Sequence, residues 1–152
     1  MEGGPVSLSY LYLFFMSLVP FVEARGSIPM GIYLGMDPME TWIVCTSSNM
    51  LVSPILYLIY PRIERFVPTD RFAKRLERKA SEIKSKYGIW RKIGVIVFVA
   101  LPIPGSGAYS GFLLSLLLGI KTLKEGVPLI SLGVMISSSL VLSASIGLLK
   151  MF

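Results

Sequence analysis

The sequence contains no histidine and one cysteine, Cys45. A lone cysteine cannot form an internal disulfide, and a chain without histidine lacks the ligands of a Cys/His zinc site. The absence of imidazole also excludes the Ser-His and Cys-His dyads of many hydrolases, in which histidine is the general base. We therefore expect neither an enzyme of these classes nor a metal or other cofactor.

Charged residues are also scarce. Of the 152 residues, 53% are hydrophobic and 16% are charged, and the mean hydropathy is +0.69. The apolar residues form long blocks without helical amphipathicity, which is typical of integral membrane proteins. A chain of this length predicts a single domain, residues 1–152, in the cell membrane.

Positive charge is concentrated in one part of the chain. Eleven of the fifteen Lys and Arg residues lie between Arg62 and Lys92, beside four acidic residues. Basic residues next to membrane segments mark the cytoplasmic side, whereas a nucleic-acid partner would require them on a folded soluble module. Residues 61–92 are therefore predicted to be a cytoplasmic connector. Within it, Pro68 to Gly88 predicts a basic amphipathic helix that lies on membrane lipids.

The first half predicts a re-entrant hairpin followed by a transmembrane helix. Residues 6–22 are apolar and contain a helix-breaking proline. A turn is predicted over Glu23–Gly26, and a second helix starts at Ser27, a suitable N-cap, and ends near Gly35. Some ten residues rise roughly 15 Å, about half of a hydrocarbon core roughly 30 Å thick, so this helix cannot span the membrane. Residues 41–60 are long enough to span it.

The second half repeats this order. Two short apolar runs flank a Pro/Gly-rich segment at residues 101–111, and a long apolar run follows at residues 126–149. The halves align at an offset of 84 residues, so that Pro20 matches Pro104. Because each half has one full crossing, the second half is inserted upside down relative to the first. The predicted fold is an all-α membrane protein with two inverted repeats, each a re-entrant helical hairpin plus one transmembrane helix, at residues 6–60 and 93–150.

Two charged residues inside apolar sequence mark the candidate site. Glu23 and Arg25 lie two residues apart, where a charge at membrane depth costs at least a few kcal/mol and is retained mainly in a polar cavity or beside a partner. Glu23 is predicted to be the proton-coupling group, because burial favours the neutral form of a carboxyl group. The alternative is that Glu23 and Arg25 only neutralise each other to hold a turn.

The tips of the two hairpins are predicted to meet halfway across the bilayer. The short helices after the tips would direct their N-terminal N–H groups at one spot, which favours an anion. Serine hydroxyls, flexible glycines and the Arg25 guanidinium would contribute to such a site, and Asn49 would contact a substrate or a neighbouring helix. The predicted residues for substrate or ion binding are Glu23, Arg25, Ser27, Pro29, Asn49, Pro104, Gly105, Ser106, Gly107, Tyr109 and Ser110.

The serine-containing tip of the second half has a further interpretation. The Pro-Gly-Ser-Gly segment around Ser106 is similar to the serine turn of intramembrane proteases. No histidine can pair with this serine, and no lysine lies in a membrane segment near it, so we expect no enzyme. Ser137 and the serines that follow it could line a path, although such serines more often allow close helix packing.

Two segments resemble a known family. Residues 23–31, EARGSIPMG, are similar to the E-x-R-G-x-I-P-x-G signature of the small multidrug export family of prokaryotic membrane proteins. Residues 102–111, PIPGSGAYSG, resemble its P-x-P-G-T-G-A-W-T-G segment, with Ser106, Tyr109 and Ser110 as conservative departures. Asn49 stands where the family has a Gly-Asn pair, with Ser48 in place of the glycine. The paired loops also resemble those of the DedA superfamily, whose members are implicated in moving polyprenyl phosphates and other lipids across bilayers.

The leading functional hypothesis is a small proton-linked secondary transporter with a midplane site between the loop tips. Its partners would be membrane lipids, protons, a small amphiphilic or anionic substrate and further copies of the chain, because so short a chain has few helices to seal a cavity. The Arg25 charge favours an anionic cargo. The alternatives are a DedA-like flippase or scramblase of lipid phosphates and a membrane scaffold that transports nothing.

Overall fold

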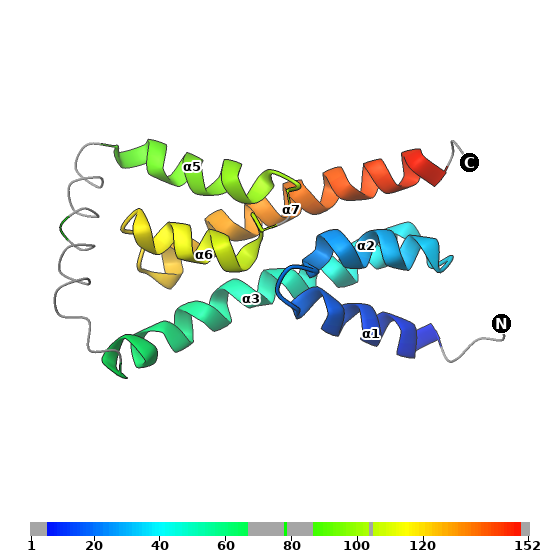
Figure 1. Ribbon diagram of the computed structural model, residues 1–152, viewed down its shortest axis with the longest axis horizontal. Coiled ribbons are helices and arrows are strands. Elements are labelled where there is room, and N and C mark those ends of the chain that lie inside the picture. The colour runs from blue at the N-terminus through cyan, green and yellow to red at the C-terminus, as the bar shows by residue number, and fades with distance from the viewer. Residues whose placement is uncertain (1–5, 67–77, 79–86, 104, 150–152) are drawn as a thin grey trace.

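The computed structural model describes residues 6–66, 78, 87–103 and 105–149, and within these ranges all regular structure is helical. The helices are α1 (Val6–Leu18), α2 (Glu23–Tyr33), α3 (Pro38–Phe66), α5 (Gly88–Ala100), α6 (Ala108–Leu117) and α7 (Leu123–Leu149). The predicted all-α class is confirmed. In Figure 1, α3 and α7 run along the long axis of the molecule, with α1 and α2 toward one end and α5 and α6 toward the other.

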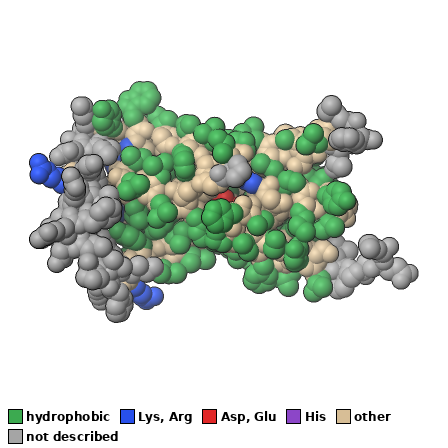
Figure 2. Space-filling model, viewed as in Figure 1, with side chains coloured by type: hydrophobic (Ala, Val, Ile, Leu, Met, Phe, Trp, Pro, Cys, Tyr) green, Lys and Arg blue, Asp and Glu red, His purple; other side chains and the backbone are tan. Residues whose placement is uncertain are grey.

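Length distinguishes the apolar helices α3 and α7 from the other helices. Their segments Pro38–Arg62 and Leu123–Leu148 contain 25 and 26 residues with mean hydropathies of 1.5 and 2.0, which is long and apolar enough to cross a membrane. The helices α1, α2, α5 and α6 contain 10 to 13 residues, so they rise only roughly 15–20 Å. Large apolar side chains are exposed over much of the surface (Figure 2), as expected of a protein in contact with lipid.

The order of two short helices and one long helix occurs twice. Adding 84 to the residue numbers of α1, α2 and α3 reproduces the bounds of α5, α6 and α7 to within two residues. The α1–α2 turn and the α5–α6 loop both lie near the middle of the long axis (Figure 1). Hydrogen bonds from α2 to this loop confirm that the two connections are neighbours.

The first hairpin differs from the prediction in its boundaries. Its turn lies at residues 19–22 and α2 begins at Glu23, so the predicted turn over Glu23–Gly26 and the predicted helix start at Ser27 are wrong. The chain turns earlier because Pro20 cannot donate a backbone N–H and Phe21 has a positive φ of 74°. Pro29 lies inside α2 rather than in its first turn.

The predicted connector is described only at its two ends. Residues 61–66 belong to α3, and α5 begins at Gly88, before the predicted start of repeat two at residue 93. Apart from Arg78, Tyr87 and Gly88, the predicted amphipathic helix from Pro68 to Gly88 lies outside the described residues. Pro104, one of the predicted site residues, lies outside them too.

Close packing of the second half depends on glycine. A Cβ atom on Gly133 of α7 would lie 2.6 Å from Cβ of Val99 on α5, and one on Gly111 of α6 would lie 2.3 Å from Cγ2 of the same valine. Val99 belongs to an apolar cluster that also contains Phe112 and Ile130. Because an added methyl group would collide at both glycines, α5, α6 and α7 approach each other closely around Val99.

Polar contacts fix the turn between α6 and α7. The hydroxyl of Tyr57 on α3 donates to the carbonyl of Ile120 at 3.0 Å and lies 2.5 Å from Oγ of Ser115. The Arg91 guanidinium on α5 donates to the carbonyl of Leu118 at 3.1 Å and lies 3.7 Å from the Glu125 carboxylate. These contacts connect both halves of the chain to this turn.

Candidate functional site

Glu23, the first residue of α2, reaches the start of α6. The residue is 5% exposed and interacts with the backbone N–H groups of Ala108 and Tyr109, the first two residues of α6. A Cβ atom at position 107 would lie 1.5 Å from Oε2 of Glu23, so the carboxylate occupies the space that Gly107 leaves open. A carboxylate at a helix N-terminus satisfies free N–H groups and complements the helix dipole. Glu23 therefore caps a helix of the other half.

Arg25, in the same turn of α2, donates hydrogen bonds with all five of its N–H groups. Nε donates to Oγ of Ser137 at 2.9 Å, and Nη1 donates to the Ile103 carbonyl at 2.5 Å and to Oγ of Ser106 at 2.8 Å. Nη2 donates to the carbonyls of Val99 at 2.7 Å and Ser106 at 3.0 Å. Val99 lies in the last turn of α5, where carbonyl groups carry partial negative charge. The guanidinium thus connects α2 with the end of α5, the following loop and α7.

Glu23 and Arg25 therefore bind opposite ends of two neighbouring helices. The carboxylate lies at the positive end of α6 and the guanidinium at the negative end of α5. Among the described residues, ion pairs join Arg91 and Lys92 to Glu125, and none joins Glu23 to Arg25. Each charge therefore contacts the other half of the chain, in addition to the electrostatic attraction between Glu23 and Arg25.

Several predicted residues meet at this junction. Tyr109 donates a hydrogen bond from its hydroxyl to the carbonyl of Leu18, the last residue of α1. Gly105 has a φ of 89°, a conformation that glycine adopts readily and other residues do not. Ser110 is half-buried and donates to the carbonyl of Gly107 at 3.2 Å, within its own helix turn. The sequence-predicted residues that the structure brings together here are Glu23, Arg25, Gly105, Ser106, Gly107, Tyr109 and Ser110.

A pocket of about 300 Å³ lies at the junction. Both halves of the chain line it, and its lining combines two charged side chains with apolar ones: Phe21, Val22, Glu23, Arg25, Gly26, Pro102, Gly105 and Val141. Figure 2 shows one acidic and one basic patch near the middle of a largely apolar face. The volume corresponds to the lower end of the range for small-molecule sites.

The remaining predicted residues do not line this pocket. Pro29 lines a separate pocket of about 270 Å³ with Tyr33 and Leu148. Ser27 is 0% exposed in α2 and Asn49 is 3% exposed in α3. Neither Oγ of Ser27 nor Oδ1 of Asn49 has a hydrogen-bond partner in the part of the chain that the structure describes.

The sequence prediction missed some groups that hold Arg25. Ser137 belongs to a run of three serines, for which helix packing was the favoured interpretation. The acceptors at Val99 and Ile103 are backbone carbonyls. Every residue carries a carbonyl, so no residue type in the sequence signals these contacts.

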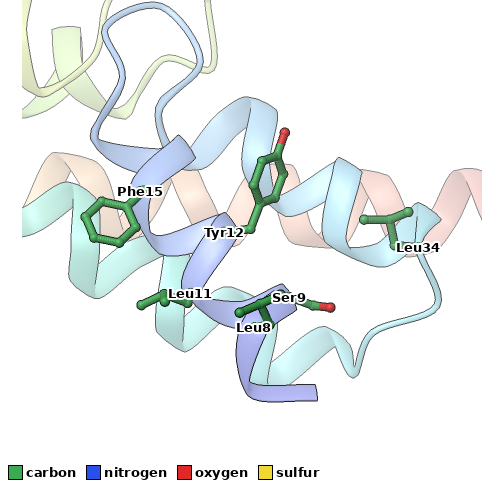
Figure 3. A pocket seen from close by; sticks show the side chains of 6 residues that line it. All are labelled: Leu8, Ser9, Leu11, Tyr12, Phe15 and Leu34. Atoms are coloured by element: carbon green, nitrogen blue, oxygen red, sulfur yellow. The ribbon is translucent and has the colours of Figure 1, made fainter. Parts of the chain in front are cut away.

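A hollow of about 430 Å³ lies on the outer face of α1 and contains no charged side chain. Figure 3 shows its lining side chains, of which Leu34 follows α2 and the others come from α1: Leu8, Ser9, Leu11, Tyr12 and Phe15. The exposed leucines, tyrosine and phenylalanine are suited to contact with lipid chains. The chemistry of the candidate site therefore lies at the junction and not in this hollow.

Comparison with known proteins gives one match. A family model described as "Putative small multi-drug export protein" matches residues 23–140. The matched segment begins at Glu23 and contains Arg25, Ser106 and Ser137, so it includes the junction between the two halves. No curated protein and no solved structure matches the chain. Since the match covers more than three-quarters of the sequence, the chain belongs to this family of small multi-drug export membrane proteins.

Proposed function

We propose that the chain is a proton-linked secondary transporter that exports small amphiphilic molecules, with Glu23 as the group that binds the proton. The observation that carries this proposal is the position of Glu23. Among the acidic residues whose side chains the structure describes, Glu23 is buried, whereas Asp37, Glu40 and Glu125 are exposed. A buried carboxylate between two parts of a membrane protein is a common proton-binding device.

In this proposal the protein is multi-pass and consists of two inverted repeats. The helices α3 and α7 cross the membrane, and the pairs α1–α2 and α5–α6 are re-entrant hairpins that enter from opposite sides. The short helices, the offset of 84 residues and the central position of both hairpin connections support this topology. The basic connector faces the cytoplasm, and residues 37–40 face outside. Further copies of the chain would enclose the transport path.

Protonation of Glu23 supplies the coupling. A neutral carboxyl group interacts more weakly with helix N-terminal N–H groups than a carboxylate does, so α6 loses its cap at Ala108 and Tyr109. The hydrogen bonds of Arg25 to the end of α5 do not depend on this proton. The start of α6 can then move relative to α5, and the junction pocket opens toward the other side of the membrane.

The charges at the junction favour a neutral or cationic amphiphile over a phosphate. The five N–H groups of Arg25 already have protein acceptors, so a phosphate would have to displace them. A deprotonated Glu23 repels an anion in the same pocket. Apolar lining from Phe21, Pro102 and Val141 suits the hydrocarbon part of an amphiphile. The anionic cargo favoured by the sequence is therefore the less favourable one at this geometry.

A membrane scaffold is the second candidate function. It is favoured by the observation that Glu23 and Arg25 both interact with protein groups across the junction. In that case the two charges only hold the halves together.

Transport in proteoliposomes separates these functions. We expect the purified protein to move the lipophilic cationic dye ethidium in response to an imposed pH gradient. Glu23→Gln, which is permanently neutral, should lose the response to the gradient, and the exposed Glu40→Gln is the matched control and should keep it. Gradient-driven movement by Glu23→Gln would refute the coupling role. Absence of ethidium movement with a folded wild-type protein would support the scaffold, and movement of a fluorescent isoprenoid phosphate instead would support the flippase.

A further inference from the structure

The first half contains a set of buried polar atoms that lack partners. None of these atoms has a hydrogen-bond partner among the residues that the structure describes: Ser27 Oγ, Thr41 Oγ1, Trp42 Nε1, Thr46 Oγ1 and Asn49 Oδ1. Apart from the half-buried Trp42, these residues are at most 3% exposed. Buried polar groups in native proteins are nearly always hydrogen-bonded, and an unpaired one indicates bound water or an ion.

The second half is packed differently at the equivalent positions. At the offset of 84 residues, the counterparts are Gly111, Glu125, Gly126, Ile130 and Gly133. A Cβ atom on Gly126 would lie 1.8 Å from the Tyr57 hydroxyl oxygen, and the other two glycines pack against Val99. Ile130, the counterpart of Thr46, is 0% exposed in the apolar cluster. Apart from the exposed Glu125, these positions are therefore closed by apolar or aromatic side chains, whereas the first half has polar atoms with unused hydrogen-bonding capacity.

Contacts between α2 and α3 set the levels of these polar residues along the two helices. The two helices are antiparallel neighbours that are joined by residues 34–37. Near their connected ends, a Cβ atom on Gly31 would lie 2.6 Å from Cγ2 of Thr41. One turn back along α2 and one turn forward along α3 bring Ser27 about level with Thr46.

The next turn extends the row to the junction. It brings Glu23 of α2 about level with Asn49 of α3. On α3, Trp42, Thr46 and Asn49 follow each other at spacings of four and three residues, so they share one face. The row therefore leads from the loop before α3 to the carboxylate at the junction.

Five residues form this row, here called the α2–α3 polar row: Ser27, Thr41, Trp42, Thr46 and Asn49. We propose that the α2–α3 polar row holds a file of water molecules that conducts protons between the Asp37–Glu40 end of the protein and Glu23. Hydroxyl and amide groups with free hydrogen-bonding capacity supply the two to four bonds that a buried water molecule needs. The charged and titratable groups that face Glu23 at the end of the file are Arg25 on α2 and Tyr109 on α6. Because the equivalent positions of the second half are closed, the proton path reaches Glu23 from the Asp37–Glu40 side and not from the other side. This inference rests on the proposed function for the role of Glu23, whereas the presence of water in the row does not.

Accessibility of single cysteines tests the file independently of transport. In a Cys45→Ala background, which removes the only native cysteine, Thr46→Cys is compared with its matched control Ile130→Cys. Sealed vesicles in nitrate buffer are exposed to Ag⁺, which reaches thiols through water-filled paths, and unreacted thiols are then labelled with a maleimide after unfolding. We expect Ag⁺ to block Thr46→Cys roughly tenfold faster than Ile130→Cys, and only from the side opposite the connector.

Three results would overturn the proposal. The first is that Ag⁺ reacts equally slowly with both cysteines, and the second is that Ag⁺ reaches Thr46→Cys from the connector side. The third is that Na⁺ but not choline protects Thr46→Cys from Ag⁺, which would indicate a cation site. If the cysteine variants do not fold, Thr46→Val is tested in their place. It should slow proton uptake into pyranine-loaded proteoliposomes several-fold without lowering thermal stability, and unchanged uptake would contradict the file. The two proposals can fail separately. If Thr46→Cys reacts rapidly with Ag⁺ but Glu23→Gln still responds to the pH gradient, the water file stands and the proposed function is refuted.

Discussion

Gly107→Ala tests whether the Glu23 carboxylate occupies the start of α6. The new Cβ atom would lie 1.5 Å from Oε2 and 2.1 Å from Cδ of Glu23, so the carboxylate must leave this position. A hydrogen bond to a charged group is worth roughly 1.5–3 kcal/mol, and alanine is a poorer N-cap residue than glycine by less than roughly 1 kcal/mol. We therefore expect the free energy of unfolding to fall by roughly 2–4 kcal/mol. For a chain of this size, that loss lowers the melting temperature by roughly 5–10 °C.

Cys45 provides the assay. It is the only cysteine and is 0% exposed, so a dye that fluoresces on reaction with thiols reports unfolding in detergent. Gly94→Ala is the control, because Gly94 lies in α5 with nothing within 4 Å of an added Cβ atom. This control should leave stability unchanged or raise it by about 0.5–1 kcal/mol.

A double-mutant cycle separates the collision from the effect of alanine on the helix start. In a Glu23→Ala background no carboxylate is present, so Gly107→Ala should cost less than roughly 1 kcal/mol. An equal loss of stability in both backgrounds would show that Glu23 does not occupy this space, and the proposed coupling through α6 would lose its structural basis.

Three other substitutions test the contacts around the junction and the helix ends, each by the same thermal assay. Arg25→Lys keeps the charge but has three donors for five acceptors, so we expect the free energy of unfolding to fall by roughly 3–5 kcal/mol. The control Arg62→Lys, at an exposed position, should lower it by no more than about 0.5 kcal/mol. Tyr57→Phe removes a buried hydroxyl that donates at 3.0 Å, and it should cost roughly 1–3 kcal/mol, whereas Tyr33→Phe at an 84% exposed site should cost almost nothing. Asp37→Ala removes the side chain that accepts two N–H groups at the start of α3, both at 2.9 Å, and it should cost about 1 kcal/mol. Equal stability of each variant and the wild type would contradict the corresponding contact.

The sequence predicts the helices well because run length and Pro/Gly breaks determine them. The predicted spans at residues 41–60 and 126–149 lie within α3 and α7. The start of α2 is wrong by four residues, since Ser27 followed by Pro29 has the pattern of a helix start. The actual start depends on the backbone at Phe21 and on the contact of Glu23 with α6, which are tertiary effects.

The candidate site is predicted in part. Charge inside apolar sequence identifies Glu23 and Arg25, because its cost must be offset by partners. The identity of the partners is not predictable in the same way: the N–H groups at the start of α6 and the carbonyl of Val99 belong to the backbone. The inverted orientation of the halves and the position of the tips at mid-membrane remain predictions that transport and topology measurements can test.

The five hydrogen bonds of Arg25 restrict how the two halves can move. A swing that preserves them has its fulcrum at the guanidinium, so atoms nearby shift little. Displacement grows with distance from a fulcrum, and a swing of about 10° moves the far end of α2, which lies roughly 12 Å from Arg25, by roughly 2 Å. The ends of α2 and α6 that lie far from Arg25 would therefore travel the most, and spectroscopic labels placed there would register a motion that labels beside Glu23 would miss.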